Sequence, residues 1–452
     1  MKWTCLGHAC WLVEAAGLRL LCDPLLESSH YGGVFEVDPP RRLRAEALRP
    51  DFVLVSHAHP DHFDLDSLAR LARLDPESVL VTPDPLVAWS ARELGFRTVH
   101  ELAAGQRVSL DGVELITTPS VAPDEWGVVI ASEEGVGWNA VDSVLGGAAA
   151  LEQVLAEVER ACRRPLDLAL VRWQPLLEIA CPLAEAQGFP YAEYRELLRE
   201  HAALPRSTTL VPSAAGTRHA GAAAWLNRFV YPLTRARFLR DLAALRPGSP
   251  ALPADPGDVL ELRGGVVTRA AGAARELVEL EPRREPSCFD PFAAPGLQDP
   301  RPLAAAERER LRAWLDEELP AVLASEAPQL APEPLVLSVE VVLAEGERWQ
   351  RTYRGAEVRA GLDPEWEGLN RVVGSALLDV LEARRDWGQL LLGGELQATS
   401  RAYRVDPRGA RRLPLAPVFL YYALSYEEAF ARYVRRRVGA LRDGAAEPAR
   451  SS

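Results

Sequence analysis

Six consecutive residues, His57-Ala-His-Pro-Asp-His62, constrain this chain more than any other feature of its sequence. They directly follow residues 51–56, an apolar run that predicts a short buried strand. Because residues i and i+2 of an extended backbone face the same side, the first two histidines can bind one metal ion. The aspartate and the last histidine stand where the chain turns toward a helix, and they can reach a second metal nearby. A polar surface loop is the alternative, but three of the chain's eight histidines fall here.

The apolar pattern around this motif predicts that strands and helices alternate along the first half of the chain. Leucines at positions 65, 68, 71 and 74 recur at helical spacing, and residues 148–162 are amphipathic, so both segments predict helices. The predicted strands are two within residues 3–23 (10–13 and 18–22), then 79–82, a hairpin over 108–116, 128–131 and 166–171.

Six prolines between residues 282 and 302 interrupt this pattern, and neither a helix nor a central strand tolerates such a density. We therefore expect a catalytic domain over residues 1–280, a proline-rich linker over residues 281–302 and a C-terminal domain over residues 303–452.

The last segment predicts a smaller α+β domain. Its predicted helices are residues 303–323, 366–385 and 427–441, and its predicted strands are residues 335–343, 347–353 and 390–399. It contains no histidine or cysteine. We therefore expect it to shape a substrate pocket rather than to carry chemistry, with a purely structural role as the alternative.

Composition limits the classes of partner. The 452 residues include 51 basic and 64 acidic side chains, and the net charge of −13 argues against a nucleic-acid partner. No apolar run reaches the ~18 residues needed to span a bilayer, and no secretory signal pattern is present, so we expect a cytoplasmic protein without membrane contact. Six cysteines without a C-x-x-C pair indicate reduced, buried thiols.

The metal-binding motif and other segments carry a resemblance to known families. H-x-H-x-D-H after an apolar strand is similar to the signature of the metallo-β-lactamase fold, which implies an αββα sandwich. Leu6-Gly-His-Ala9 and Leu21-Cys-Asp-Pro24 resemble the opening of its lactonase-like and phospholipase D-like branches. The chain also resembles the CMP-N-acetylneuraminate hydroxylase family over residues 123–130, 139–143, 211–216 and 386–393, and at His219, Arg401 and residues 406–407. This sequence shows no counterpart of that family's Rieske iron–sulfur domain.

The resemblance implies the remaining metal ligands. Asp142 matches an aspartate that bridges two metals, and His219 matches the last histidine of the second site; a helix-capping aspartate and a solvated loop histidine are the alternatives. Related hydrolases usually supply a histidine as the third ligand of the first site, but residues 101–200 contain none. The matching segment offers Asp124 and Glu125, and the family pattern assigns the ligand to Glu125, with a missing ligand as the alternative.

Two more residues are implied near the centre. His8 lies where related branches place a residue near the active site, so it would contact substrate or transfer a proton, or else pack through a supporting hydrogen bond. We expect Asp23 to support the metal loop through hydrogen bonds. The histidines at positions 30, 100 and 201 have no partners in sequence, so we interpret them as structural or exposed.

The sequence therefore predicts a two-metal site, with the metals ~3.5–4 Å apart. Its predicted ligands are His57, His59 and Glu125 on the first metal, Asp61, His62 and His219 on the second, and Asp142 between them. His8 and Asp61 are the candidate catalytic residues. A carboxylate in place of an imidazole makes the site harder, which favours iron, with zinc or manganese as alternatives.

Two functions compete for this site. The favoured one is a di-iron oxygenase that uses dioxygen to hydroxylate a small polar metabolite or biosynthetic intermediate. The alternative is a hydrolase that opens a lactone, ester or phosphodiester. A non-enzymatic binding module is disfavoured because the ligand set is nearly complete. The chain has no Rieske ligand pairs and no dinucleotide-binding glycine motif, so an oxygenase would take electrons from a separate protein or from its substrate.

Overall fold

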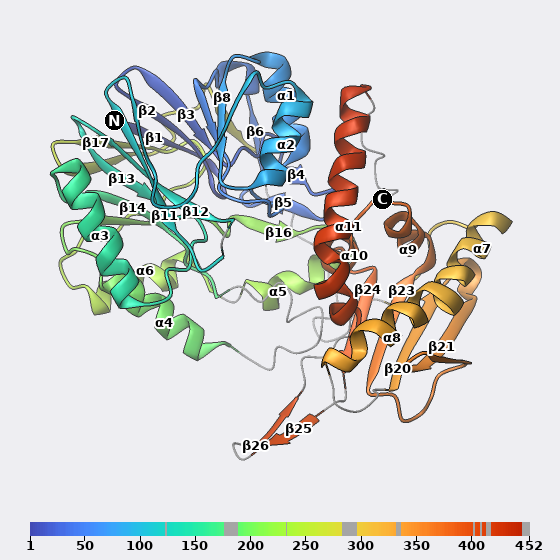
Figure 1. Cartoon of the computed structure of the whole chain (residues 1–452). Helices are drawn as coiled ribbons and strands as arrows, with labels where there is room; N and C mark the ends of the chain where they lie inside the picture. The colour runs from blue at the N-terminus through green and yellow to red at the C-terminus, as the bar shows by residue number, and fades with distance from the viewer. Residues whose placement is uncertain are drawn as a thin grey trace.

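The structure, a computed structural model, describes residues 1–122, 124–175, 189–231, 233–282, 296–330, 336–400, 403–406, 409–412 and 417–444. Two large β-sheets stack against each other in the N-terminal part, with helices on their outer faces, and a smaller sheet with its own helices lies beside them (Figure 1). The predicted α/β class is confirmed.

The first sheet has the strand order β18-β17-β1-β2-β3-β7-β8-β9. Its strands are β1 (Lys2–Gly7), β2 (Cys10–Ala15), β3 (Leu18–Cys22), β7 (Phe52–Leu54), β8 (Val79–Thr82), β9 (Thr98–Glu101), β17 (Val259–Arg263) and β18 (Val266–Ala270). Residues 3–23 therefore contribute to three strands, not the predicted two. The additional strand, β1, pairs Lys2 with Glu261, a distant partner that a local pattern does not reveal.

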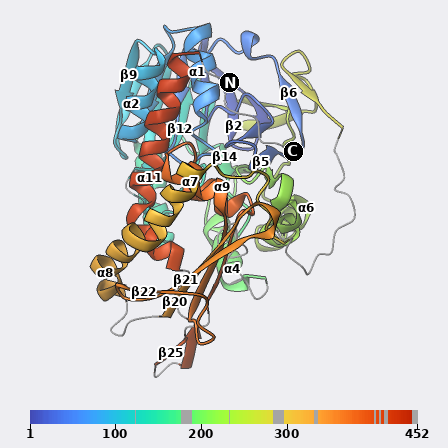
Figure 2. The same ribbon diagram turned by 90° about the vertical axis from the view of Figure 1, so that its right-hand side faces the viewer.

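Helices α1 (Leu65–Leu74) and α2 (Pro85–Leu94) cover the outer face of the first sheet (Figure 2). The prediction of α1 is confirmed. Although α2 was not predicted, its signals stand in the sequence: Asp84 accepts hydrogen bonds from the main-chain N–H groups of Leu86 and Val87, and Gly95 ends the helix in the left-handed conformation.

The second sheet has the order β10-β11-β12-β13-β14-β15. Its strands are β10 (Arg107–Leu110), β11 (Val113–Pro119), β12 (Trp126–Ser132), β13 (Gly135–Asn139), β14 (Leu168–Val171) and β15 (Thr209–Pro212), and its outer face carries α3 (Ala148–Cys162), α4 (Tyr191–Ala202) and α6 (Arg235–Leu245). The predicted hairpin, strands and helix of this region are confirmed.

Shorter elements lie at one end of the two sheets. They are β4 (Ser29–His30), β5 (Phe35–Val37), β6 (Arg41–Leu43), β16 (Thr217–His219), β19 (Val278–Leu280), the 3-10 helices η1 (Ala45–Ala47) and η2 (Gly221–Leu226), and α5 (Asn227–Val230). The strand β16 pairs with β5, so residues near position 219 lie beside residues near position 35.

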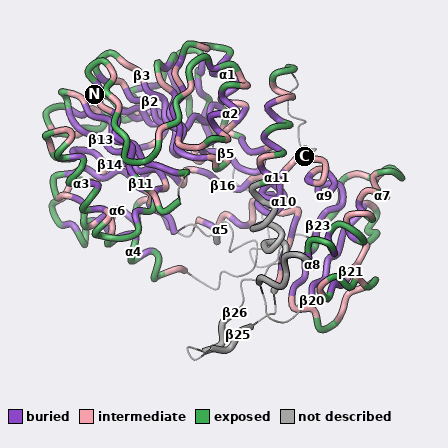
Figure 3. Tube along the Cα trace, in the orientation of Figure 1, coloured by how far each residue is buried: buried purple, intermediate pink, exposed green. Residues whose placement is uncertain are grey.

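Buried side chains form three layers in this domain. The buried residues are coloured purple in Figure 3. Trp3, Trp11 and Trp126 lie in the layer between the two sheets, and separate apolar layers lie under the helices of each sheet. The sheets approach closely, because a Cβ at Gly137 would clash with Cζ2 of Trp3. The predicted αββα sandwich is confirmed. The thiols of Cys5, Cys10 and Cys22 are free and buried, as predicted, whereas Cys162 is half-buried; positions 181 and 288 lie outside the described residues.

The C-terminal part contains a five-stranded sheet of order β22-β21-β20-β23-β24. Its elements are α7 (Ala305–Ala313), the π-helix η3 (Trp314–Glu318), α8 (Leu319–Leu330), β20 (Val336–Val342), η4 (Ala344–Gly346), β21 (Arg348–Arg354), β22 (Glu357–Ala360), β23 (Gly368–Val373), α9 (Gly374–Leu381), α10 (Trp387–Leu392), β24 (Leu396–Ser400), β25 (Tyr403–Asp406), β26 (Gly409–Arg412) and α11 (Pro417–Arg442).

For two segments of this part, the predicted type of secondary structure is wrong over the first residues of the segment. Residues 366–385 were expected to form one helix, but β23 precedes α9, because Gly368–Val373 pairs with β20 and β24 in the sheet. Residues 390–399 were expected to form a strand, but α10 extends to Leu392 before β24 begins. Short apolar runs are ambiguous between helix and strand until their neighbours are known.

The last helix, α11, leaves the C-terminal sheet and packs against α1 and α2 (Figures 1 and 2). Phe430, Tyr433, Val434 and Val438 join the apolar layer under these two helices, and Arg437 donates a hydrogen bond to Asp66 at 2.5 Å.

Of the helices in the described ranges, none has the length and apolar character that a membrane crossing requires.

Candidate metal centre

The predicted metal loop lies between β7 and α1, at the end of the first sheet. His57 and His62 are 3% and 0% exposed, whereas the side chain of His59 lies in solvent. The ring of His57 is central in this group: its centroid lies 4.3 Å from that of His59 and 4.4 Å from that of His62. The loop thus directs three imidazoles toward one region.

Asp23, which directly follows β3, fixes this loop. Its Oδ1 accepts a hydrogen bond from the main-chain N–H of Ser56 at 2.8 Å, and its Oδ2 accepts from Oγ of Ser56 and Nδ1 of His62, both at 3.0 Å. The expectation that Asp23 supports the loop by hydrogen bonding is confirmed.

The surroundings of His62 resemble those of a metal ligand. Since Asp23 accepts the Nδ1 proton, Nε2 carries the lone pair in the neutral ring. That Nε2 faces two further acceptors, Oδ2 of Asp142 at 3.1 Å and Oδ2 of Asp61 at 3.4 Å. Burial opposes a positive charge on His62, but the three carboxylates outweigh it and raise its pKa well above the usual value. A cation is the natural group to share such a set of acceptors.

As in His62, the Nδ1 atom of His57 faces a group that can accept its proton. Oγ of Ser56 donates to Asp23 and so can accept the Nδ1 proton of His57, which lies 2.8 Å away. The Nε2 atom of His57 is buried and has no hydrogen-bond partner within the described ranges. Burial, followed by the neighbouring imidazoles of His62 and His59, holds the pKa of His57 well below its usual value. The ring is therefore neutral, with a lone pair available for a metal.

His219 repeats this pattern at the end of β16. Its Nδ1 donates to the main-chain carbonyl of Leu392 at 2.9 Å, and its buried Nε2 has no hydrogen-bond partner in the described part of the chain. Burial lowers the pKa of His219 to about 4, so the ring is neutral at pH 7. The buried, unpartnered Nε2 atoms of His57 and His219 are the observation that best fits the group to metal ions.

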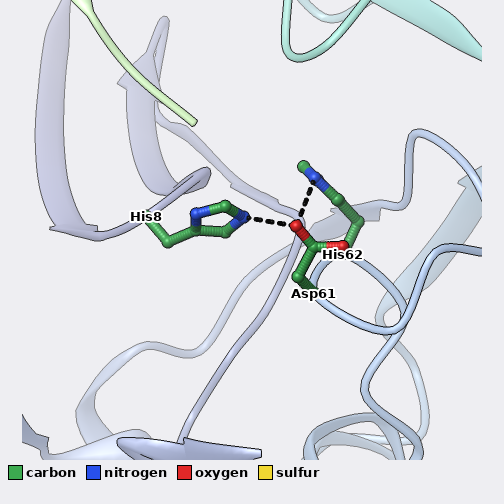
Figure 4. A group of neighbouring side chains, drawn as sticks. All are labelled: His8, Asp61 and His62. Carbon is green, nitrogen blue, oxygen red and sulfur yellow. Dashed lines mark ion pairs between the residues drawn. The ribbon is translucent and has the colours of Figure 1, made fainter. Parts of the chain in front are cut away.

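His8 is oriented in the opposite way. Its Nδ1 accepts a hydrogen bond from the main-chain N–H of Gly216 at 3.1 Å, so the proton of the neutral ring is on Nε2. That Nε2 lies 3.2 Å from Oδ2 of Asp61 (Figure 4). His8, Asp61 and His62 are close enough to share a metal, but the Gly216 N–H makes His8 a donor to Asp61 rather than a ligand.

Asp61 and Asp142 supply the carboxylates between the imidazoles. Burial opposes the charge on each, but His62 outweighs it and lowers both pKa values, so both groups are ionised. The ligand atoms of His57, His62 and Asp142 all lie within 4.8 Å of one another. His59, Glu125 and His219 lie outside the two closest groups of ligand atoms.

Glu125 is 9% exposed, and the adjacent Asp124 points into solvent. Burial, and then the charge of Asp142, raises the pKa of Glu125. Oγ of Ser120 donates to Oε1 of Glu125 at 3.1 Å and accepts from the main-chain N–H of Val144 at 3.2 Å. Ser120 therefore ties the Glu125 segment to the loop that carries Asp142, a link that the sequence did not reveal.

Unusual backbone conformations gather around the site. His8, Asp23, Val141, Ala214 and Ala215 all have positive φ, between 41° and 79°. Such conformations are costly for residues other than glycine, and most of all for a β-branched residue such as Val141, which immediately precedes Asp142. A concentration of this kind is typical of functional sites.

His30, for which the sequence predicts only a structural or exposed role, lies near the candidate ligand His219. His30 is 4% exposed and stacks on Phe35 with ring centroids 5.8 Å apart, and Phe35 in turn lies 4.9 Å from the ring of His219. Burial, followed by repulsion from His8, lowers the pKa of His30 to about 3. A buried imidazole of this kind has no local sequence signal. His201 is also buried, and His100 is exposed.

Comparisons with known proteins agree with the fold. Residues 2–143 match the model of the Beta-lactamase superfamily domain. A protein of Mycolicibacterium smegmatis named as a Rieske 2Fe-2S iron–sulfur protein is 33% identical over 116 residues, which is 25% of this chain and 22% of that protein. A UPF0173 metal-dependent hydrolase of Pyrobaculum calidifontis is 29% identical over 152 residues, which is 32% of this chain and 62% of the hydrolase. The chain thus matches less than two thirds of either relative.

Two solved structures of low identity are similar to part of this chain. An isothiocyanate hydrolase from Delia radicum gut bacteria is 16% identical, with a TM-score of 0.43 over 58% of this chain and 99% of that one. CmlA, a diiron β-hydroxylase of Streptomyces venezuelae, is 18% identical, with a TM-score of 0.41 over 58% of this chain and 54% of that one. The family match over residues 2–143 and the two stacked sheets support the metallo-β-lactamase fold, and the grouped His and Asp side chains are candidate ligands of a binuclear metal site.

Proposed function

We propose that this chain is a di-iron oxygenase that hydroxylates a small polar metabolite. The observation that carries the proposal is Glu125, a buried carboxylate near Asp142, which would give the first site two carboxylates beside the imidazoles of His57 and His59. Oxygen ligands favour harder metals than an all-imidazole set does. A pair of iron ions held here would supply the chemistry of dioxygen activation, which also requires a source of electrons.

The residues of the chain would then hold and orient the centre. His57, His59 and Glu125 would bind the first metal, Asp61, His62 and His219 the second, and Asp142 both. His8 would donate its Nε2 proton to Asp61 and so position that carboxylate. Because His59 is the exposed member of the set, we place the substrate on its side of the site.

Two likenesses support this proposal. The resemblance to the CMP-N-acetylneuraminate hydroxylase family implies an oxygenase, and a nucleotide sugar as its substrate. The M. smegmatis relative is named as a Rieske iron–sulfur protein, and iron–sulfur proteins are a class of electron donor suited to an oxygenase. We therefore propose a separate electron-donor protein as partner.

The test combines metal analysis with isotope labelling. Protein purified without added metal would be incubated anaerobically with a small-metabolite extract and a chemical reductant or ferredoxin, and then given labelled dioxygen. We expect an iron-containing protein and a product that carries label from dioxygen, found by comparing mass spectra with and without label. Protein loaded with zinc is the matched control and should form none of this product.

A hydrolase is the second candidate, and one specific observation favours it: the P. calidifontis relative, matched over 62% of its length, is named as a metal-dependent hydrolase. In that case the metals would lower the pKa of water to yield a nucleophile. The same incubation, repeated without dioxygen in labelled water, separates the two functions. Product that forms equally well without dioxygen, with label entering only from water, would replace the oxygenase by the hydrolase.

A further inference from the structure

We propose that the C-terminal domain completes the metal centre, because the last carbonyl of α10, on Leu392, orients the ring of His219, and the hydrogen bond between Tyr31 and Asp386 holds α10 in place. This inference rests on the proposed role of His219 as a ligand. It makes Tyr31 and α10 positioning elements of the second metal site, with no direct contact to substrate.

The hydrogen bonds at the end of α10 leave one carbonyl for His219. A helix leaves its last four carbonyls without helical partners. In α10 the following turn satisfies three of them: Gly393 N–H donates to Gln389, Gly394 N–H to Leu391 and Glu395 N–H to Leu390, at 2.9–3.1 Å. The fourth, on Leu392, accepts from Nδ1 of His219 at 2.9 Å.

The start of α10 is fastened to the catalytic domain. Asp386 is 0% exposed, and its Oδ1 accepts hydrogen bonds from the main-chain N–H groups of Gly388 and Gln389 as the N-cap of the helix. The same oxygen accepts the hydroxyl of Tyr31 at 2.5 Å. This bond crosses from the β4–β5 region of the catalytic domain to the C-terminal domain.

Packing supports the same placement. The side chain of Leu392 forms a small buried cluster with Tyr31, Val34 and Phe35, and Phe35 lies 4.9 Å from the ring of His219. The backbone beyond the helix is close as well: a Cβ at Gly394 would lie 3.4 Å from the main chain of Ala223 in η2. A shift of α10 would therefore move the acceptor of His219.

The consequence concerns metal affinity. With Nδ1 donating to Leu392, the lone pair stays on Nε2, where a metal can take it. If that carbonyl moves away, the ring loses the partner that fixes its tautomer and orientation. Loss of such outer partners typically costs about 10–100-fold in metal affinity.

The test uses Tyr31→Phe in the full-length protein and a zinc titration against a chromophoric chelator. We expect the second zinc to bind at least about tenfold more weakly than in wild type, with the first zinc unchanged. The matched control is Tyr353→Phe, which removes another buried tyrosine hydroxyl whose hydrogen bond, to the carbonyl of Leu315 at 2.9 Å, lies within the C-terminal domain. It should lower stability without changing either zinc affinity.

Two further outcomes keep this inference separate from the proposed function. If His219→Ala binds both zinc ions as wild type does, the ligand assignment itself is wrong. If His219→Ala loses the second zinc but Tyr31→Phe does not, only the role of α10 is refuted. Should Tyr31→Phe fail to fold, nitrogen NMR of histidine-labelled, zinc-loaded wild type decides: the inference requires the proton of His219 on Nδ1, and a proton on Nε2 would overturn it.

Discussion

Oδ2 of Asp61 lies 3.2 Å from Nε2 of His8, while the main-chain N–H of Gly216 occupies the opposite nitrogen of the same ring. A main-chain N–H can only donate, so it fixes the proton of the neutral imidazole on Nε2. The three buried imidazoles of the proposed ligand set have the reverse arrangement, with an acceptor at Nδ1. The partners of each ring thus separate a supporting histidine from candidate ligands.

This relationship predicts the behaviour of His8 variants. His8→Ala should keep two metals but bind the second about tenfold more weakly, because Asp61 loses the donor that orients it. His8→Gln, which can place an amide N–H near the position of Nε2, should retain most of the affinity. Zinc titrations of both variants against wild type would check this, and loss of a whole metal equivalent in His8→Ala would make His8 a ligand instead.

Glu125 and Asp124 offer a matched pair of neighbouring carboxylates, one buried and one exposed. Glu125→Gln should reduce the metal content to one equivalent, because the amide replaces a charged ligand of the first metal. Asp124→Asn should leave two equivalents. Elemental analysis after dialysis measures both, and the reverse result would assign the ligand to Asp124.

His201 predicts a pH dependence of stability away from the metals. Burial lowers its pKa to about 3, and its Nε2–H donates to the carbonyl of Arg172 at 2.7 Å. Below pH 6.5 the His201 side chain of the unfolded chain therefore binds a proton that the folded chain excludes. The stability that the neutral His201 contributes is fully present above pH 6.5, and it is lost as the pH falls toward the folded pKa of about 3. From pH 7 to 5 the loss is about 2 kcal/mol.

His201→Gln should remove that contribution. Urea titrations at pH 7 and pH 5 with a chelator present would measure the free energy of unfolding of both proteins. Wild type should lose about 2 kcal/mol more than the variant on acidification. An equal loss in both would show that His201 titrates normally in the folded chain.

The sequence predicted the parts of the site that follow one another along the chain. The spacing of His57, His59, Asp61 and His62 after a buried strand indicated a metal loop, and Asp23 was correctly interpreted as its support. The αββα sandwich followed from resemblance together with the strand pattern. These features depend on local periodicity or on a short motif, which a single sequence displays.

The parts that could not be predicted depend on contacts between distant segments. The pairing of β1 with β17, the burial of His30 behind Phe35, and the contact between His219 and Leu392 join residues far apart in sequence. For α10 the local signal was present, because Asp386 and Gln389 form a capping box, but the apolar run after it also suited a strand.

The central claim is a binuclear iron centre held by His219 and six side chains from three loops, and anomalous diffraction tests it most directly. Crystals of protein purified without added metal would be measured just above and just below the iron absorption edge. We predict two anomalous peaks ~3.5–4 Å apart, one within bonding distance of Glu125 and the other of His219, both lost below the edge. A single peak, or two metal positions whose anomalous signal does not change across the iron edge, as zinc would give, would contradict the account.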